Sequence, residues 1–453
     1  MTVKSAPRDA DVLVIGAGIS GLFAARALER AGRSVIVLEA SDRVGGRMRT
    51  VQVGDDHVDL GAHWIGPGQN HIASLVRELG IATRPQPVGG RTVIRVAGQR
   101  QLYRGSVPIL APAVMADAAI GTIRLWWQYR GLGFDGPAGD QRRASLDNMT
   151  GADLRDRVYR TPSGCALFDM IVALTTGALP AELSALHLLA MLEAGGGLKR
   201  ISDFKGGAQQ DTLVGGTQQI CDRLAGQLSR PVELENPVKV VEQNDHGVTA
   251  HTHTGSRTAR LCLIAFCPGR VLDIEFSPSL PAGRVEALRR TRLGGYSKAI
   301  AFYDRPWWRD KGLNGIGLAA DGPVQMVVDG LAESGRGMLV GFLTGPPGTA
   351  FAALNADARR QAALGEFTRL IGPEAAHPVD YLDFCWTNHP WLRGGHMSTP
   401  EPGALTAFGG LPSAPIGRLH WTSSELGRVN HGYMDGAIES GQRAAEEILG
   451  RES

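Results

Sequence analysis

The sequence predicts an α/β fold into which a second, α+β domain is inserted, and three observations favour it. A buried strand, a glycine-rich turn, a helix and a second buried strand follow one another between residues 11 and 39. Motifs that belong with this unit recur near the middle of the chain and near its C-terminus. The stretches between them differ in character, and 453 residues are too many for one ordinary core.

Composition places the chain among ordinary globular proteins. Hydrophobic residues make up 43% and charged residues 20%, which excludes a disordered chain. A net charge of +2 indicates neither a nucleic-acid partner nor an acidic membrane surface. Five cysteines without a CxxC pair predict buried free thiols and no metal site. Neither end carries an apolar leader or membrane segment, so we expect a soluble, cytoplasmic protein.

The N-terminal unit has the pattern of a nucleotide-binding crossover. Residues 11–15 (DVLVI) and 34–38 (SVIVL) are short, apolar and β-branched, as buried strands are. Residues 20–31 repeat apolar side chains at helical spacing, and Gly32 follows as a stop signal. The two strands and the helix therefore predict one βαβ unit.

The turn inside this unit fits the GxGxxG pattern. Gly16 permits a sharp turn, Gly18 lets the backbone approach a pyrophosphate, and Gly21 lets the helix pack closely on the strand. The N-terminus of the helix then faces the phosphates with its partial positive charge. Glu39 lies at the end of the second strand, where an acidic side chain can bind both ribose hydroxyls. This region is predicted to bind a dinucleotide.

The rest of the chain divides into further expected elements. These are helical stretches from about 80 to 211 that include Trp126, Trp127 and Tyr129, a helix at 183–193, a strand at 212–214, a helix at 217–229, paired strands at 238–254 and 257–266, a helix at 283–292, a strand at 296–303, a helix at 354–371, and a last helix at 436–449 that opens after Gly436. The predicted nucleotide domain consists of 1–80, 212–285 and 395–453, and the predicted substrate domain of 81–211 and 286–394.

The segment after Glu39 distinguishes FAD from NAD. It ends in Arg43-Val44-Gly45-Gly46-Arg47, where adjacent glycines let the chain fold back over a pyrophosphate and a flavin. Here the sequence resembles the flavin-containing amine oxidase family, which includes monoamine oxidase. Further segments resemble that family in the same order, at 59–72, 212–225, 236–243, 293–308 and 420–449. The resemblance implies a Rossmann-like FAD-binding domain of the glutathione-reductase/monoamine-oxidase type.

The resemblance also implies a set of residues that contact FAD. They are Gly16, Gly18, Gly21, Glu39, Arg43, Gly46, Arg47, Gly61, Ala62, His63, Trp64, Val238, Ser424, Glu425, Tyr433 and Met434. Substrate contacts are implied by position for Trp64, Leu174, Thr175, Ile201, Gln209, His396 and Met397. The alternative for each of the latter is an ordinary core or loop residue.

Two residues are implied to be catalytic. Lys298 interrupts the apolar stretch YSKAIAFY, and in the family this lysine holds a water beside flavin N(5), where a buried charge would help oxygen accept an electron. Without the resemblance, an edge-strand lysine facing water is the simpler interpretation. Tyr433 corresponds to one wall of the aromatic cage in front of the flavin, although it could also be a plain core aromatic residue.

The sequence departs from the family at the flavin anchor. Monoamine oxidases have Gly-Gly-Cys-Tyr where this chain has Gly394-Gly395-His396-Met397, which implies non-covalent FAD and places Met397 at the second cage tyrosine. Ser423 replaces a usual glycine, and Asn430 a frequent tryptophan. His63 is the one titratable side chain expected at the flavin face.

The function implied by the resemblance is FAD-dependent amine oxidation. A hydride passes from the amine α-carbon to flavin, the imine is hydrolysed, and oxygen re-oxidises the flavin with release of hydrogen peroxide. A desaturase, isomerase or porphyrinogen-type oxidase of a non-amine metabolite is the alternative on the same fold, and a non-enzymatic, redox-responsive flavoprotein is a third. The long insertion favours a substrate domain. Expected partners are a small-molecule amine and oxygen, with a homodimer left open, and the sequence does not distinguish primary from secondary amines.

Overall fold

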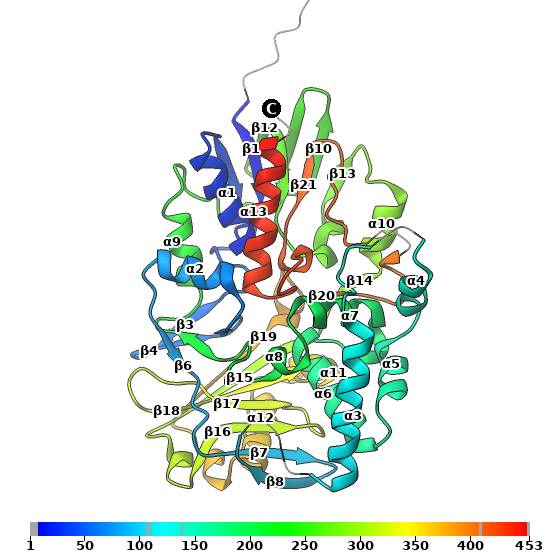
Figure 1. Ribbon diagram of the computed structural model, residues 1–453. Coiled ribbons are helices and arrows are strands. Elements are labelled where there is room, and N and C mark those ends of the chain that lie inside the picture. Colours follow the sequence, from blue (N-terminus) through cyan, green and yellow to red (C-terminus); the bar gives the residue numbers. More distant parts are fainter. Residues whose placement is uncertain (1–7, 106–107, 109, 137–138, 407–409, 451–453) are drawn as a thin grey trace, which may run out of the picture.

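The computed structural model describes residues 8–105, 108, 110–136, 139–406 and 410–450. The expectations for the two ends of the chain fall largely on residues 1–7 and 451–453, which lie outside the described residues. Two large sheets and a layer of helices make up the molecule (Figure 1).

The first sheet is built from three separated parts of the chain. Parallel pairing joins β1 to β2, to β12 and, through β12, to β21. The seven strands are β13 (Glu275–Ser277), β10 (Val240–Asn244), β11 (Gly247–Thr252), β12 (Gly255–Ile264), β1 (Ala10–Ile15) and β2 (Val35–Leu38), in that order, with β21 (Leu419–Trp421) beside β12. The predicted βαβ unit is confirmed, with α1 (Ile19–Arg30) between its strands.

Helix α13 (Met434–Gly450) packs on α1, so the last helix of the chain covers the N-terminal unit (Figure 1). Residues 12–15 of β1 are apolar and buried because helices cover one face of the sheet and a second apolar cluster covers the other. Both ends of the sequence therefore contribute to one nucleotide-binding layer.

The second sheet is mostly antiparallel and lies on the far side of the molecule from α13 (Figure 1). Its strands, in order, are β19 (Asp380–Cys385), β15 (Tyr296–Tyr303), β18 (Gly337–Thr344), β17 (Met326–Asp329), β16 (Leu313–Ala319), β7 (Arg91–Val96) and β8 (Gln99–Tyr103). The predicted strand at 296–303 is confirmed. The β7–β8 hairpin was not predicted, and it turns at Ala97 and Gly98, which both have positive φ.

The remaining helices are distributed over both layers of the molecule. They are α2 (Asn70–Glu78), α3 (Pro112–Tyr129), α4 (Gln141–Asp147), α5 (Gly151–Val158), α6 (Pro162–Thr176), α7 (Ala185–Ala194), α8 (Leu198–Ser202), α9 (Gln219–Ala225), α10 (Ala282–Arg289), α11 (Pro346–Ala352) and α12 (Ala356–Leu370). Within the described residues no helix has the length and hydropathy that crossing a bilayer requires.

Small strand pairs connect the two layers. One three-stranded sheet consists of β5 (Trp64–Ile65), β9 (Asp211–Leu213) and β6 (Thr83–Pro85), and two-stranded ladders pair β3 (Thr50–Val53) with β4 (Asp56–Asp59) and β14 (Thr291–Leu293) with β20 (Ser398–Pro400). The β5–β9 pairing brings residues 64 and 212 together, which places two of the family-like segments side by side. The predicted domain boundaries themselves stay a prediction.

Four predicted elements have different bounds in the structure, and one of them, the strand expected at 238–254, is divided into β10 and β11. The helix expected at 217–229 is confined to α9, and the helix expected at 283–292 ends at Arg289 because β14 takes the next residues. The last helix opens at Met434 and not after Gly436. Gly436 lies inside its first turn, where a Cβ atom would meet the Asn430 carbonyl oxygen at 2.6 Å.

Candidate functional site

A single large cavity links the two layers. Its volume is about 1040 Å³, above the roughly 300–1,000 Å³ of ordinary small-molecule pockets. It begins at Ile15 and Leu38, the carboxyl ends of β1 and β2, and continues past β15, β16 and β18 to α3 and α6. Nucleotides bind at this edge of a parallel sheet, so the cavity has room for a dinucleotide and a second ligand beyond it.

The three glycines of the turn have the geometry that a pyrophosphate site requires. Gly16 has a φ of 109°, and a Cβ atom there would meet the Ala265 carbonyl oxygen at 2.8 Å. Gly18 precedes α1 and lines the cavity, and an added Cβ would meet nothing within 4 Å. A Cβ on Gly21 would meet the Gly16 carbonyl oxygen at 2.2 Å. The open space at Gly18, in front of a helix N-terminus, fits a phosphate group.

Glu39 lies against this turn, at the end of β2. Its side chain is buried, and its carboxylate accepts hydrogen bonds from the backbone N–H groups of Ala17 (2.7 Å) and Ser41 (2.9 Å). Each carboxylate oxygen keeps a second lone pair, so both can still accept from the two hydroxyls of a ribose.

Replacing Glu39 by Ala should therefore yield largely apoprotein. Each charge-assisted hydrogen bond to the ribose contributes about 1.5–3 kcal/mol, so the FAD dissociation constant should rise at least tenfold. The flavin-to-protein absorbance ratio after purification and a titration with FAD measure the effect. Full flavin occupancy with an unchanged dissociation constant would contradict the role of this residue.

The glycine pair of the next segment faces the first turn. Gly45 donates its N–H to the Ala17 carbonyl oxygen at 2.9 Å, and Gly46, with a φ of 56°, lies opposite Gly18. Arg43 was predicted to contact the cofactor, but it does not line the cavity. Its guanidinium instead donates to the carbonyl oxygens of Val44, Gly46 and Met48 (2.7–3.0 Å), because this tight turn leaves those acceptors without partners.

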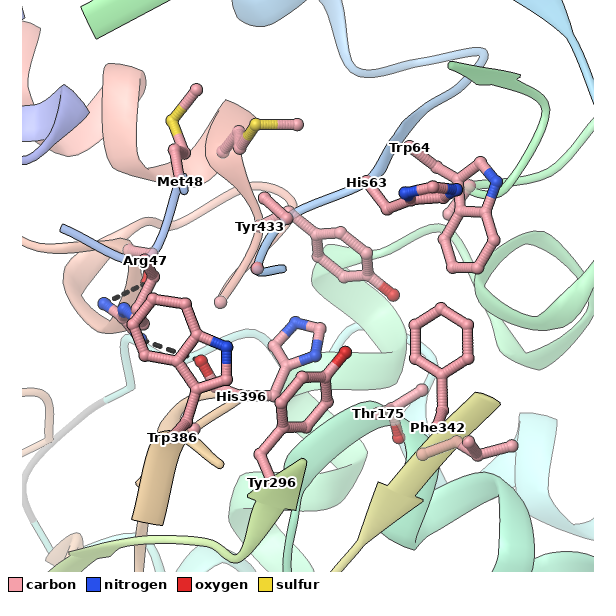
Figure 2. Close-up of a pocket in the computed structure, with 18 of the residues that line it drawn as sticks. Arg47, Met48, His63, Trp64, Thr175, Tyr296, Phe342, Trp386, His396 and Tyr433 are labelled. Carbon is pink, nitrogen blue, oxygen red and sulfur yellow. Dashed lines mark hydrogen bonds between the residues drawn. The ribbon is translucent and has the colours of Figure 1, made fainter. Parts of the chain in front are cut away.

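Arg47 and Glu425 connect three distant segments below the cavity. The guanidinium donates to both Glu425 carboxylate oxygens (2.7 and 2.9 Å), to Ser424 Oγ (3.0 Å) and to the His396 carbonyl oxygen (2.9 Å), as Figure 2 shows in part. Burial disfavours the charged carboxylate, but the Arg47 charge outweighs it and lowers the pKa of Glu425 to about 2. Arg47 and Ser424 line the cavity, whereas Glu425 does not and acts by positioning Arg47.

Residues 61–64 form the cavity wall next to this ion pair. A Cβ atom on Gly61 would meet the Arg47 carbonyl oxygen at 1.8 Å, which explains the need for glycine at this position. Gly61, Ala62, His63 and Trp64 all line the cavity. The indole of Trp64 donates to Gln86 Oε1 (2.9 Å) and stacks on the Phe342 ring at 5.2 Å.

His63 is buried and neutral in this wall. Burial, followed by the charge of Lys298, lowers its pKa well below the usual value. Neither ring nitrogen has a hydrogen-bond partner within the described residues, and Nδ1 lies 3.8 Å from Asp59 Oδ2. The sequence predicted His63 as the titratable side chain at the flavin face, and it lines the cavity there.

Lys298 lies behind the same wall. Its side chain is fully buried, and Nζ donates to the carbonyl oxygens of Asp59 (2.8 Å) and Gly61 (2.7 Å). Burial lowers the pKa of Lys298 to about 7, although the Asp59 charge partly opposes this shift. The edge-strand alternative is wrong, because β15 has neighbours on both sides and the ammonium group is inside the protein. Its contact with a water or with oxygen stays a prediction.

Three rings meet at the chamber beyond the predicted flavin position (Figure 2). Tyr433 and His396 stand edge to face at 6.1 Å, and His396 and Tyr296 do so at the same distance. Met397, predicted to face the substrate, does not line the cavity. Its side chain is fully buried in the helical core and packs against Gly432, so His396 supplies the second wall that the sequence assigned to Met397.

The other residues that were predicted to contact FAD or the substrate line the cavity. Val238 and Met434 line the nucleotide part, and the substrate part is lined by Leu174, Thr175, Ile201, Gln209 and His396. Gly21 is the one predicted glycine that stands outside it, with a packing role.

Sequence reasoning missed Tyr296 and Phe342 in the same chamber. The sequence held a signal for Tyr296, whereas only the strand register of the structure identifies Phe342. Tyr296 stands two residues before Lys298 on β15, and residues two apart on a strand share a face. Phe342 is the residue of β18 that pairs with Lys298.

Comparisons with known proteins agree with this geometry. The family model described as flavin containing amine oxidoreductase matches residues 19–449. A Mycobacterium tuberculosis protein, AofH, whose name describes it as a flavin-containing monoamine oxidase, is 38% identical over 98% of each chain, and amine oxidase B of Bos taurus is 33% identical over 97% of this chain and 86% of its own. Cyclohexylamine oxidase from Brevibacterium oxydans superimposes with a TM-score of 0.93 at 31% identity, covering 98% and 99% of the two chains.

Proposed function

This chain belongs to the family of flavin-containing amine oxidoreductases, and from that premise we propose that it oxidises a primary or secondary amine bound in the chamber between Tyr433, His396 and Phe342. It is an FAD-dependent amine oxidase. One observation supports this position for the amine. A continuous cavity joins the backbone at Gly18, where the nucleotide would bind, to the aromatic rings.

The residues present fit FAD. Gly18 and the N-terminus of α1 would hold the pyrophosphate, Glu39 the ribose, and the backbone at Val238 the adenine. Tyr433 and Met434, at the start of α13, would face the isoalloxazine ring, with the helix N-terminus favouring negative charge there. Bound FAD supplies the acceptor for the two electrons removed from the carbon–nitrogen bond.

The chamber favours a neutral amine. Burial raises the pKa of both Tyr296 and Tyr433 far above the usual value, and burial followed by the Arg47 charge lowers the pKa of His396 to about 4. All three groups are therefore uncharged near neutral pH. An ammonium ion that enters loses hydration without gaining a counterion from these rings, so its proton is released more easily.

Amine oxidation is preferred to the two alternative functions that the sequence left open. AofH, amine oxidase B and cyclohexylamine oxidase are named for amine oxidation, which does not favour a desaturase of a non-amine metabolite or a redox-responsive binding module. Hydrogen peroxide as the product of oxygen reduction, a cytoplasmic location and a homodimer remain proposals that the sequence first suggested.

The test is peroxide release with a panel of amines. A coupled peroxidase assay should respond to one or more of primary, secondary and polycyclic amines, and the flavin absorbance should bleach when the same amine is added without oxygen. Bleaching without peroxide would identify a dehydrogenase. Neither signal with any amine would contradict the proposed function.

The flavin should be bound without a covalent link. Among the described residues, Cys267 is the one cysteine that lines the flavin part of the cavity. It is buried next to the Arg47–Glu425 pair. Precipitation with acid should release a yellow supernatant that contains intact FAD, as judged by mass spectrometry. Flavin that stays with the precipitated chain would show that this expectation is wrong.

A further inference from the structure

The outer side of helix α3 is apolar. A helix at the surface of a globular protein normally presents charged and polar side chains to water. In α3 the exposed residues at the helical spacing of three and four are instead alanine, isoleucine and tryptophan. Ile123 and Trp127 are both 58% exposed, and Ile120 is 49% exposed. The α3 face consists of Ala113, Ala116, Ile120, Ile123 and Trp127.

The opposite side of α3 anchors the helix without help from this face. Leu125 and Tyr129 are buried in the helical core. The buried Asp117 carboxylate accepts hydrogen bonds from the backbone N–H groups of Arg160 and Thr161, at 2.9 and 2.7 Å. The packing of α3 therefore does not need the apolar side chains on its outer side. A row of exposed apolar residues that the core does not use indicates a binding surface.

Two tryptophans and an arginine stand together at the C-terminal end of the α3 face. The rings of Trp126 and Trp127 lie edge to face at 5.0 Å, and Trp126 is 43% exposed. The Arg130 guanidinium lies over both rings, at 4.8 and 4.7 Å from their centroids. Tryptophan side chains beside a cation, with one edge apolar and one edge polar, suit the boundary between water and lipid.

Two more arginines lie beside the α3 face. Arg124 donates to the Val158 carbonyl oxygen (3.1 Å) and Arg142 to the Gln128 carbonyl oxygen (2.8 Å). Within the part of the chain that the structure describes, no carboxylate forms an ion pair with these two or with Arg130, and all three are exposed. The net charge of the whole chain, +2, averages over this local excess of positive charge.

The same helix borders the substrate part of the cavity. Ala118 and Thr122 of α3 line it, and Thr122 is also exposed, so the cavity reaches the surface beside the α3 face. Figure 1 shows α3, in cyan, at the margin of the helical layer next to the second sheet. Whatever binds the α3 face therefore lies close to the route by which a substrate enters.

We propose that the α3 face binds the surface of a membrane that contains anionic lipids. The two isoleucines and Trp127 enter the boundary between headgroups and acyl chains, and the three arginines contact the lipid phosphates. Held in this way, the cavity opens next to the lipid, where an apolar amine concentrates. The inference concerns where the protein binds and does not depend on the reaction that the chamber performs.

Flotation of the FAD-loaded protein with lipid vesicles measures the binding. The vesicles consist of phosphatidylcholine alone, or of phosphatidylcholine and phosphatidylglycerol at roughly three to one. The partition coefficient should be at least tenfold higher on the mixed vesicles, because each arginine near an anionic surface strengthens binding several-fold.

One pair of substitutions removes apolar surface from the α3 face. Ile123→Gln combined with Trp127→Gln should lower the partition coefficient on the mixed vesicles at least tenfold, because two exposed apolar side chains no longer enter the lipid. Val379→Gln is the matched control, since Val379 is 57% exposed and precedes β19 on the second sheet. It should bind the vesicles as the wild type does.

A second pair of substitutions removes charge. Arg124→Gln combined with Arg130→Gln should lower the partition coefficient on the mixed vesicles about tenfold or more, and should change binding to neutral vesicles much less. Arg289→Gln is the control, because Arg289 is an exposed arginine on α10. It should leave both values unchanged.

Fluorescence identifies which side of the protein meets the lipid. The chain has eight tryptophans, and bromine atoms on the lipid acyl chains should quench the emission of Trp126 and Trp127. Trp126→Phe combined with Trp127→Phe keeps apolar rings on α3, so this variant should still float with the vesicles but lose most of the quenching.

The outcomes that would overturn the inference are distinct. They are no flotation with the mixed vesicles, flotation that the Ile123→Gln/Trp127→Gln variant retains in full, or quenching that persists without Trp126 and Trp127. A wild-type dimer that this Gln variant dissociates in sedimentation velocity, without vesicle binding, would assign the α3 face to a second copy of the chain. Flotation that only the α3 variants lose supports the inference, whatever the peroxide assay shows.

Discussion

Replacing Lys298 by Met is expected to slow the reaction of the reduced enzyme with oxygen by about 100-fold, which corresponds to roughly 2.7 kcal/mol of lost stabilisation. The ammonium group is fully buried, and its two hydrogen bonds to backbone carbonyls hold it behind Gly61. A positive charge at that depth stabilises superoxide, the anion formed when oxygen accepts an electron. Methionine keeps the length of the side chain and removes the charge.

The measurement is stopped-flow absorbance of the two half-reactions separately. Anaerobic reduction by the amine should be largely unchanged, while re-oxidation by oxygen slows. Lys311→Met is the control, because Lys311 is half-exposed and paired with Glu374 at the surface. Unchanged re-oxidation in Lys298→Met would refute the oxygen role. Loss of bound flavin together with both half-reactions would assign the lysine a structural role.

The Lys298 ammonium group predicts a pH dependence of flavin re-oxidation. The pKa of Lys298 is lowered to about 7, so the charged form predominates below this pH and the neutral amine above it. The rate of re-oxidation in the wild type should therefore fall as the pH rises through about 7. The Lys298→Met enzyme should be slow at every pH and lack this step.

Replacing Glu425 by Gln is expected to lower the free energy of unfolding by about 3–5 kcal/mol. The substitution keeps the shape of the side chain but leaves the Arg47 guanidinium without its counterion inside the protein. The Glu425 side chain is 3% exposed and that of Arg47 is 24% exposed, so water replaces the lost charge poorly. Urea unfolding followed by tryptophan fluorescence, with saturating FAD, measures the loss.

A less buried ion pair provides the control. Glu333 pairs with His57, and these side chains are 20% and 39% exposed, so Glu333→Gln should cost less than Glu425→Gln. Similar losses for the two variants would mean that burial does not set the value of the Arg47–Glu425 pair.

The pKa of Glu425 predicts how the stability of the protein changes with pH. The folded pKa of Glu425, about 2, is below the value of roughly 4.3 for an unfolded glutamate. Its contribution is therefore complete above the unfolded pKa and is lost as the pH falls from about 5 toward 2. The wild type should lose stability over this range more steeply than Glu425→Gln. Parallel losses in the two proteins would contradict the assignment of the low pKa to this residue.

The sequence by itself determined the nucleotide half of the protein. Gly16, Gly18 and Gly21 predicted the turn, the open approach and the close helix packing that the structure has, because each property depends on a missing Cβ atom within a few residues. The strand and helix periods predicted β1, α1 and β2 for the same local reason. The order of motifs along the chain then predicted which segments share that layer.

Only the tertiary structure decided which side chains face the substrate. Met397 and His396 are neighbours in sequence and both were predicted to face the substrate, but only His396 lines the cavity, since a shift of one residue reverses which side chain points inward. Arg43 carries the charge expected of a cofactor contact, yet nearby carbonyl groups bind it first. The Arg47–Glu425 pair depends on a contact between residues 378 positions apart, which no local pattern encodes.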